Sequence, residues 1–559
     1  MDQVLELLVL GVLAIAAAAV ASRRVGVASP LLLLGLGAVV GLLPFVPTVA
    51  VQPEWILAGV LPPLLYSAAV SMPAMEFRRE LRAISGMSVV LVVASALVLG
   101  WFFTLVVPGL SFAWGVALGA IMSPTDAVAT SIVKRIGVSP RVVAILEGEG
   151  LLNDATALVL LRAATVAAAT SWSVGGVVRD FVVAAVLAGA VGYVVGRANL
   201  WVRARTPEAA VATAVSLTVP FAASVPAERL EASGLVAAVV AGLVTGRGAP
   251  RVLSPQARLS DAEVWHTVEL LLEGAVFLVM GLELYGLLVD LDEADHRLLP
   301  TVLVAFAALA IVLVVRAAYV VPLLLAVHRR AARGAAVRPR VDALRELTED
   351  PDRFAAALTD RPPPRGRLLR WAVEKRRRRL RLEPEHVEQF GTRLRRRLAD
   401  IDHLVDDPLG PREGAVVVWA GMRGAVTLAA AQTLPSDTPE RSLLVFLAFC
   451  VAAGSLVLQG ATLGLLVRWV RPAGVDTEAL ARERAQLVEV LRATAERVRR
   501  DASEEGVPLL VAVIEAQRDV LLDLAREGTF ATASLRAAMA VLDADQIRLE
   551  LRGKPVEDA

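Results

Sequence analysis

Cysteine is almost absent from this chain of 559 residues, and its scarcity excludes several classes of site. One cysteine, Cys450, has no partner for an internal disulfide and rules out a metal site built from several thiolates. The first apolar run is followed directly by the basic residues Arg23 and Arg24. We therefore expect this run to remain in the protein as a membrane helix.

Charge is also scarce, but only in one part of the chain. Hydrophobic residues make up 56% of the sequence and the mean hydropathy is +0.61, yet few charges occur between Val4 and His328. Residues 329–412 and 471–559 are instead crowded with charge. This division predicts a transmembrane domain over residues 1–470, with a charged cytoplasmic insertion at 329–412, and a cytoplasmic helical domain over residues 471–559.

The apolar runs are long and continuous, which predicts an all-α polytopic membrane protein. Spanning a bilayer takes about 20 apolar residues, and only helices or closed barrels satisfy the backbone there. Because the runs do not alternate with polar residues, helices are the interpretation, and we count about thirteen spans. They are approximately Val4–Ala21, Val27–Pro44, Pro53–Ser71, Ile84–Val107, Phe112–Val133, Arg141–Thr170, Val174–Val202, Ala209–Val225, Leu230–Gly246, Val268–Val289, Leu298–Val327, Gly414–Pro435 and Leu443–Val467.

The basic residues between these spans predict the topology. They are concentrated in alternate loops, whereas the other loops are poor in Lys and Arg, and the loop at residues 290–295 is acidic. The positive-inside rule then places the amino terminus outside and the carboxyl terminus in the cytoplasm. We expect a multi-pass protein of the plasma membrane, which in a bacterium is the inner membrane.

Two spans are interrupted at matching positions. Residues 123–126 (Ser-Pro-Thr-Asp) break the fifth span, and residues 421–424 (Gly-Met-Arg-Gly) break the twelfth. If spans one to six and eight to thirteen are repeats, their odd offset makes them inverted. Transporters of this kind place broken helices at corresponding positions of the two halves, near the bilayer midplane. The pattern predicts two inverted repeats with two broken, crossing helices.

The sixth span carries the polar pair Asn153–Asp154. A carboxylate at membrane depth is costly unless it is paired, hydrated or protonated, so such residues mark ion paths and proton relays. Asp154 is flanked by the polar Asn153 and the small Ala155, which suits a hydrated cavity. The alternative is a polar pair that only joins neighbouring helices.

The break in the fifth span predicts the rest of an ion site. Pro124 lacks an amide hydrogen and frees carbonyls just before it. Thr125 is expected to cap the half-helix that follows, with Asp126 in its first turn, where the helix dipole favours negative charge. Free carbonyls, the Thr125 oxygen and the Asp154 carboxylate together suit a monovalent cation. Asp126 is an additional ion-site candidate, or it only neutralises the half-helix.

Further charges within the spans need partners. We expect Glu149 to pair with Arg316, which removes two unfavourable charges together. Arg423 lies between two glycines, where it can neutralise the carbonyl end of a broken half-helix. For Arg162 the sequence offers Glu273 and Glu283 and does not choose between them.

Several motifs, in order, resemble cation/proton antiporter family one, which includes the bacterial and animal sodium/proton exchangers. The segments are Leu61–Leu65, Ser123–Ala129, Leu146–Asp154, Phe277–Leu284 and Gly421–Val426. The resemblance covers roughly Val4 to Val467 and implies a homodimer whose core domain moves against a dimerisation domain. It implies that Asp154 binds a cation or a proton, that Asn153 marks the electroneutral branch, and that Glu149 with Arg316 forms a structural ion pair.

The resemblance predicts a secondary active Na+/H+ antiporter with no cofactor, in which Asp154 binds sodium and a proton in turn. Electroneutral one-for-one exchange follows if one carboxylate carries either ligand. Two residues depart from the family pattern. Ser67 stands where the family often has an acid, and Gly150 stands where it usually has a cation-binding serine. Ser67 or water can replace the missing oxygen, and exchange of K+ or of several monovalent cations is the alternative.

Two other classes of protein are alternatives, an intramembrane aspartyl protease and a cation channel. An intramembrane aspartyl protease would use two aspartates, but neither Asp126 nor Asp154 lies in a Gly-x-Gly-Asp motif. A cation channel could share an oxygen-lined site but would conduct either ion alone. The sequence therefore favours a transporter that is not an enzyme.

The soluble parts predict a membrane-lipid contact and a helical bundle. The insertion contains the runs Arg361–Arg365 and Lys375–Arg379, and a polybasic cytoplasmic segment attracts anionic lipids at about 1 kcal/mol per charge. A solvated helical face is the alternative, whereas nucleic-acid binding is not expected. Residues 477–552 have apolar positions at helical spacing, separated by Gly506 and Gly528.

Overall fold

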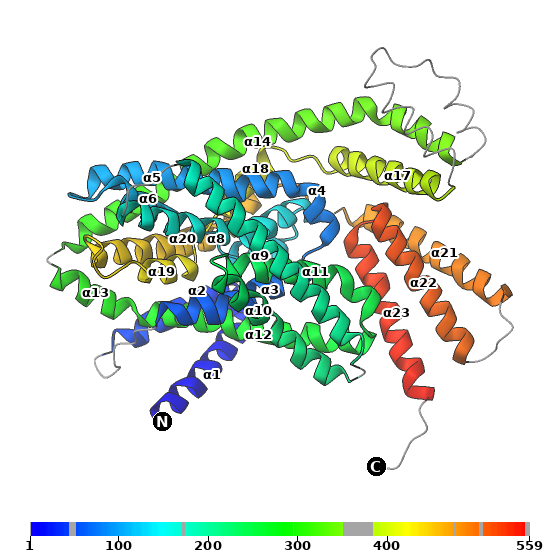
Figure 1. Ribbon diagram of the computed structural model, residues 1–559, viewed down its shortest axis with the longest axis horizontal. Coiled ribbons are helices and arrows are strands. Elements are labelled where there is room, and N and C mark those ends of the chain that lie inside the picture. Colours follow the sequence, from blue (N-terminus) through cyan, green and yellow to red (C-terminus); the bar gives the residue numbers. More distant parts are fainter. Residues whose placement is uncertain are drawn as a thin grey trace. The chain divides into compact units, whose positions relative to one another are not determined.

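The computed structural model of the chain describes residues 2–43, 52–169, 174–206, 208–294, 296–349, 384–474, 476–501 and 507–553. Within them every named element is helical, as the sequence predicts (Figure 1). The two basic runs of the insertion, Arg361–Arg365 and Lys375–Arg379, lie outside the described residues. Their interaction with lipid therefore stays a prediction.

The chain forms two compact units. The membrane unit comprises Met1–Leu323 and Pro411–Val475, and the second unit comprises Leu324–Gly410 and Asp476–Ala559. The helices of the membrane unit are α1 (Asp2–Val25), α2 (Ser29–Gly41), the π-helical η1 (Trp55–Val60), α3 (Leu61–Ser71), α4 (Ala74–Ser85), the π-helical η2 (Gly86–Leu91), α5 (Val92–Val106), α6 (Phe112–Ile121), α7 (Val128–Ile136), α8 (Pro140–Ala169), α9 (Val174–Arg203), α10 (Ala209–Arg229), α11 (Gly234–Val252), α12 (Pro255–Leu282), α13 (Leu284–Glu293), the first part of α14 (Leu298–Glu349), α18 (Pro411–Trp419), α19 (Ala425–Gln432) and α20 (Arg441–Val470).

The membrane unit has the apolar helices of a multi-pass membrane protein. Among the described residues, nine helices are long and apolar enough to cross a bilayer. Ser29–Gly41, Trp55–Ser71 and Phe112–Ile121 are shorter apolar helices. The predicted fifth span consists of the short helices α6 and α7, and the predicted twelfth consists of α18 and α19. The breaks are therefore where the sequence predicts them, while the total of about thirteen spans stays a prediction.

The helices of the membrane unit pack in two groups. The α12 group contains α1–α3 and α9–α12, and the α8 group contains α4–α8 and α18–α20; contacts within each group are more extensive than contacts across them. In the α12 group, α2 lies along α12 with the backbones touching. A Cβ on Gly281 would lie 2.8 Å from the Cα of Gly37. Small residues allow this approach, as is usual where helices meet in membranes.

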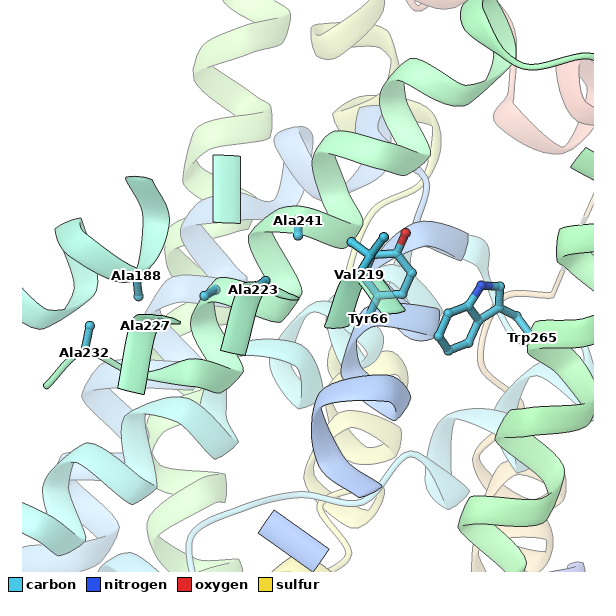
Figure 2. Close-up of a cluster of buried hydrophobic side chains, with 9 residues drawn as sticks. Tyr66, Ala188, Val219, Ala223, Ala227, Ala232, Ala241 and Trp265 are labelled. Atoms are coloured by element: carbon cyan, nitrogen blue, oxygen red, sulfur yellow. The ribbon is translucent and has the colours of Figure 1, made fainter. Parts of the chain in front are cut away.

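An alanine-lined core holds α9, α10 and α11 together beside α3 and α12 (Figure 2). The rings of Tyr66 and Trp265 face each other at one end of this core, with centroids 5.1 Å apart. The indole nitrogen of Trp265 donates to the Ser216 hydroxyl at 2.9 Å. The aromatic pair thus fixes α12 against α3 and α10 without leaving the indole N–H unsatisfied.

The segment after α20, residues 471–474, is bonded to the turn between α7 and α8, and we call it the terminal strap. Val138 forms an isolated antiparallel bridge with Gly474, and the Ser139 amide donates to the Ala473 carbonyl at 3.1 Å. The Ala473 amide donates in turn to Glu413 Oε1 at 2.8 Å. The strap therefore joins the start of α18 to the turn that precedes α8.

The second unit contains the end of α14 with α17 (Pro384–Asp406), α21 (Thr477–Asp501), α22 (Val507–Glu527) and α23 (Thr532–Gly553). Leu487, Ile514, Leu521, Leu535 and Leu542 form the core of its carboxyl-terminal helices. The described part of the insertion, α17, packs on α22, where Arg395 pairs with Glu527 at 2.8 Å. The sequence placed this insertion with the membrane domain, whereas the structure groups it with the carboxyl-terminal helices.

Leu521→Ala should destabilise the carboxyl-terminal bundle, because Leu521 is 1% exposed at its centre. Truncation of a buried leucine costs about 2–5 kcal/mol. Limited proteolysis of the full-length protein in detergent should show faster cleavage within residues 477–553. Val541→Ala, on the same bundle but 61% exposed, is the matched control and should leave the cleavage rate unchanged. Equal cleavage of the two variants would contradict the assigned core.

Candidate ion-binding site

The two broken helices are hydrogen-bonded to each other at their breaks. α6 ends at Ile121 and α7 begins at Val128, whereas α18 ends at Trp419 and α19 begins at Ala425. The amide of Asp126 donates to the carbonyl of Met422 at 2.8 Å. The unwound backbone of each break thus supplies a partner that a continuous helix would have supplied itself.

The sequence predicts that Thr125 caps the half-helix and that Asp126 lies in its first turn, and this is wrong. α7 begins later, and the backbone amide of Val128 donates to Asp126 Oδ1 at 3.1 Å. The N-cap position is Ala127, and the Asp126 carboxylate, one residue earlier, accepts from the first amide of the helix. The reason is the bond between the Asp126 amide and the second break, which holds this residue outside the helix.

Asp126 also lies against the beginning of α19. A Cβ on Gly424, the residue before α19, would lie 2.5 Å from Asp126 Cγ, so only a glycine leaves room for the carboxylate. Asp126 therefore lies at the amino ends of two half-helices, where both helix dipoles favour its negative charge. This geometry supports the predicted neutralising role of Asp126.

Arg423 lies at the opposite, carbonyl end of a half-helix, as the sequence predicts, but of the other broken helix. Its Nη1 donates to the carbonyls of Ser123 and Pro124, at 2.9 and 3.1 Å, just beyond α6. The Arg423 amide donates to the hydroxyl of Ser455 at 2.8 Å. Sequence reasoning missed Ser455, whose signal was a hydroxyl in the middle of the apolar run of α20.

Asn153 and Asp154 face the first break from α8. Asn153 Nδ2 donates to the Thr125 hydroxyl at 2.5 Å, and Asn153 is 0% and Asp154 5% exposed. Asp154 lies within electrostatic reach of Asp126 and Arg423. Within the described residues, three buried oxygens of this cluster accept no hydrogen bond: Asn153 Oδ1, Asp154 Oδ1 and Asp126 Oδ2. Buried oxygens without donors suit a cation, because a hard cation takes oxygen ligands.

Position 150 faces the same break one turn earlier on α8. A Cβ built on Gly150 would lie 3.8 Å from the Thr125 carbonyl oxygen, which is an ordinary contact. A larger side chain therefore fits here and would point a further atom toward the cluster. Position 150 thus lacks a side-chain oxygen because the residue is glycine, and not because the surrounding space is too small for a side chain.

The predicted pair of Glu149 and Arg316 is present and almost fully buried. Arg316 donates through both Nη atoms to the Glu149 carboxylate, at 2.7 Å for Nη2 and Oε2, and through Nε to the Val417 carbonyl at 3.0 Å. A Cβ on Gly421 would lie 2.6 Å from Arg316 Nε. Gly421 thus admits the guanidinium that joins α8, α14 and α18.

Two further side chains that the sequence singles out are Ser67 and Arg162. The Ser67 hydroxyl interacts with Glu269 on α12, and no hydrogen bond joins it to Asp154 or Thr125 among the residues described. Arg162 is exposed, and in the described part of the chain it pairs with neither Glu273 nor Glu283. The long arginine side chain needs no buried partner because it reaches the surface of the unit.

The fold and the site define a membrane protein with two crossed, broken helices around a buried carboxylate. The family model described as "Sodium/hydrogen exchanger, transmembrane" matches residues 10–338. The chain belongs to this family, as its motifs predict.

Relatives and a solved structure agree with this family. An uncharacterized Na+/H+ exchanger of Mycobacterium tuberculosis is 29% identical over 469 residues, 82% of this chain and 73% of that protein. A sodium, potassium, lithium and rubidium/H+ antiporter of Bacillus pumilus is 27% identical over 280 residues, 48% of this chain and 42% of that protein. The sodium proton antiporter MjNhaP1 of Methanocaldococcus jannaschii has the same fold, with a TM-score of 0.56, 16% identity, and coverage of 84% of this chain and 98% of that chain.

Gly424→Ala should disturb the crossing of the two breaks, because the new methyl group would overlap the Asp126 carboxylate. Overpacking of this kind typically costs about 1–3 kcal/mol. Thermal unfolding of the purified protein should therefore occur at a lower temperature. Gly189→Ala is the control, since a Cβ there meets nothing within 4 Å. An unchanged unfolding temperature for Gly424→Ala would contradict the close approach of Asp126.

Proposed function

We propose that the protein is a secondary active antiporter that exchanges a monovalent cation, sodium in the first instance, for a proton. The observation that carries the proposal is Asp154, a nearly buried carboxylate with an unpartnered oxygen beside the Thr125–Asn153 hydrogen bond. An uncompensated carboxylate at membrane depth is unfavourable. Asp154 is stabilised when it binds either a proton or a cation, and the two ligands exclude each other.

Competition at one carboxylate gives obligate exchange. The site opens to the other side of the membrane only while Asp154 carries a proton or a cation. Without either ligand the movement would bury an uncompensated carboxylate. One carboxylate that trades one proton for one monovalent cation moves no net charge. The division of the membrane unit into an α8 group and an α12 group supports alternating access by movement of one group against the other.

Asn153 and Asp126 support Asp154 in this scheme. Asn153 donates to Thr125 and so orients an oxygen of the break, while it adds no second charge on α8. Asp126 already serves two helix ends, which leaves Asp154 as the carboxylate on which the exchange depends. The same use of Asp126 argues against an aspartyl protease, in which both aspartates activate water.

The cation is sodium in the names of the family and of several relatives, and one relative is named for sodium, potassium, lithium and rubidium. Gly150 has no side-chain oxygen where the family pattern leads us to expect a serine, and Ser67 offers a hydroxyl in place of an acid. A site with fewer fixed oxygens discriminates less by size. Exchange of potassium or of several monovalent cations is therefore the second candidate.

The remaining features of the proposal follow from the sequence. We propose a homodimer in the plasma membrane, with the amino terminus outside and the carboxyl terminus in the cytoplasm. The topology rests on the alternation of basic loops, and the dimer rests on the family resemblance.

Asp154→Asn should abolish cation-dependent proton movement, because an amide can neither release a proton nor bind a cation as a carboxylate does. The measurement is pH-gradient dequenching in everted vesicles, with sodium, lithium and potassium titrated separately. Asp290→Asn, at an exposed acid on α13, is the control and should retain exchange.

Full activity in Asp154→Asn would overturn the assignment of the site. In reconstituted vesicles, exchange that generates or responds to a membrane potential would overturn one-for-one stoichiometry. Proton flux without a counter-cation would identify a channel instead.

Gly150→Ser should lower the sodium concentration for half-maximal exchange. The serine Cβ fits 3.8 Å from the Thr125 carbonyl and adds a hydroxyl beside the cluster. One added ligand oxygen is worth about 1 kcal/mol, a change of about fivefold. Gly150→Ala, which adds the Cβ without the oxygen, is the matched control. If both variants change the sodium dependence equally, the effect is one of packing and not of ligation.

A further inference from the structure

One face of α12 carries ionisable side chains that the proposed exchange does not yet use. His266, Glu269 and Glu273 are spaced three and four residues apart, so they lie on one face of the helix. His266 is exposed, whereas Glu269 and Glu273 are partly buried. The stripe therefore runs from the surface into the interior of the membrane unit.

The outer acid of the stripe, Glu269, lies among groups from both helix groups. It interacts with the Ser67 hydroxyl of α3 and is within electrostatic reach of Lys134 and Glu147. Lys134 and Glu147 form an ion pair with each other, and the lysine side chain is 54% exposed. Glu269 thus lies at a polar place near the surface, next to the end of α7 and the start of α8.

The inner acid, Glu273, has a different environment. The charges within its reach are both negative, those of Asp126 and Glu269. Within the described residues no lysine or arginine forms an ion pair with Glu273, and Arg162, for which the sequence offers it as a partner, is exposed. A half-buried carboxylate near other acids and without an ion-pair partner is stabilised by a proton or by a cation.

The packing of α12 against α19 explains why Glu273 reaches Asp126. Val276, one turn after Glu273, lines a shallow crevice together with Ala425, the first residue of α19. Gly424, directly before Ala425, is the residue against which Asp126 lies. Glu273 therefore lies toward the amino end of α19, within electrostatic reach of Asp126.

An independent observation indicates what this acidic cluster holds. The unpartnered oxygens Asp154 Oδ1 and Asp126 Oδ2 are buried in it, and Asp154 is only 5% exposed. Asp126 lies within electrostatic reach of both Asp154 and Glu273. Arg423 lies within electrostatic reach of Asp154, but its Nη1 already donates to the carbonyls of Ser123 and Pro124.

We propose that Glu273 is a second carboxylate of the cation site, contributed by α12, and that Glu269 passes the cation to it from the surface. The inference rests on the proposed function, since it takes Asp154 as the carboxylate of exchange. The ligand is a monovalent cation, because it replaces a proton at Asp154. In this arrangement Glu273 supplies an acidic oxygen that neither Ser67 nor Gly150 provides.

The position of Glu273 gives it a particular role in the transport cycle. It belongs to the α12 group, whereas Asp154 and Asp126 belong to the α8 group. A cation between Asp154 and Glu273 joins the two groups only while they face each other as they do here. Glu273 therefore contributes to affinity on one side of the membrane and releases the cation when the groups separate.

Glu273→Gln tests the role directly in reconstituted full-length protein. Loss of one charged ligand should raise the sodium concentration for half-maximal exchange by about tenfold or more, with exchange still detectable at saturating sodium. Glu273→Asp keeps the charge on a shorter side chain. Its sodium concentration for half-maximal exchange should lie between those of the wild type and of Glu273→Gln. Glu263→Gln, at an exposed acid on the same helix, is the matched control and should behave as wild type.

A second readout separates ligation from packing. Sodium should raise the unfolding temperature of the wild-type protein in a concentration-dependent manner, since a ligand of the folded state stabilises it. The sodium concentration for half of this effect should shift by the same factor in Glu273→Gln. If that variant does not fold, Glu273→Asp carries both measurements.

The outcomes distinguish a failure of the proposed function from a failure of the proposed role of Glu273. Wild-type protein without any cation-dependent proton movement would overturn the proposed function. Wild-type exchange with an unchanged sodium dependence in Glu273→Gln and Glu273→Asp would overturn only the role of Glu273. A lower maximal rate with an unchanged sodium concentration at half-maximum would assign Glu273 to movement and not to binding, and would also overturn it.

Discussion

The site depends on how the ends of four half-helices are neutralised inside a membrane. Each broken helix exposes amides at one end and carbonyls at the other, which are costly where no water reaches them. Asp126 lies at the amino ends of α7 and α19, and Arg423 donates to the carbonyls beyond α6. Arg316 does the same for α18 through the Val417 carbonyl. With these charges in place, Asp154 Oδ1 is left without a hydrogen-bond partner, which is the basis of its proposed role in exchange.

The two glycines of the second break have a single physical explanation. Each lies where a charged side chain from another helix crosses the backbone: Arg316 at Gly421 and Asp126 at Gly424. Gly424 has φ −124° and ψ −163°, an extended conformation open to any residue. Space, and not backbone freedom, therefore requires a glycine at that position.

Much of the site could be predicted from the sequence because its charges are few and each needs a partner. The pairing of Glu149 with Arg316 and the placement of Arg423 at a carbonyl end followed from this reasoning alone. The helix cap could not be predicted, because Asp126 is held by Met422, a contact between residues nearly 300 positions apart. The exposure of Arg162 could not be predicted either, because it depends on the packing of α8, which periodicity does not reveal.

The terminal strap has a consequence for the covalent connections between the two units. The chain passes between the units at three points, and two of them adjoin residues that are bonded to each other. Arg412, just after one crossing, donates to the Arg471 carbonyl at 3.4 Å, and Glu413 accepts from Ala473, just before another. Both connections converge on the turn in front of α8, the helix of Asp154. A force on the carboxyl-terminal helices therefore acts first on the hydrogen bonds between the strap and that turn.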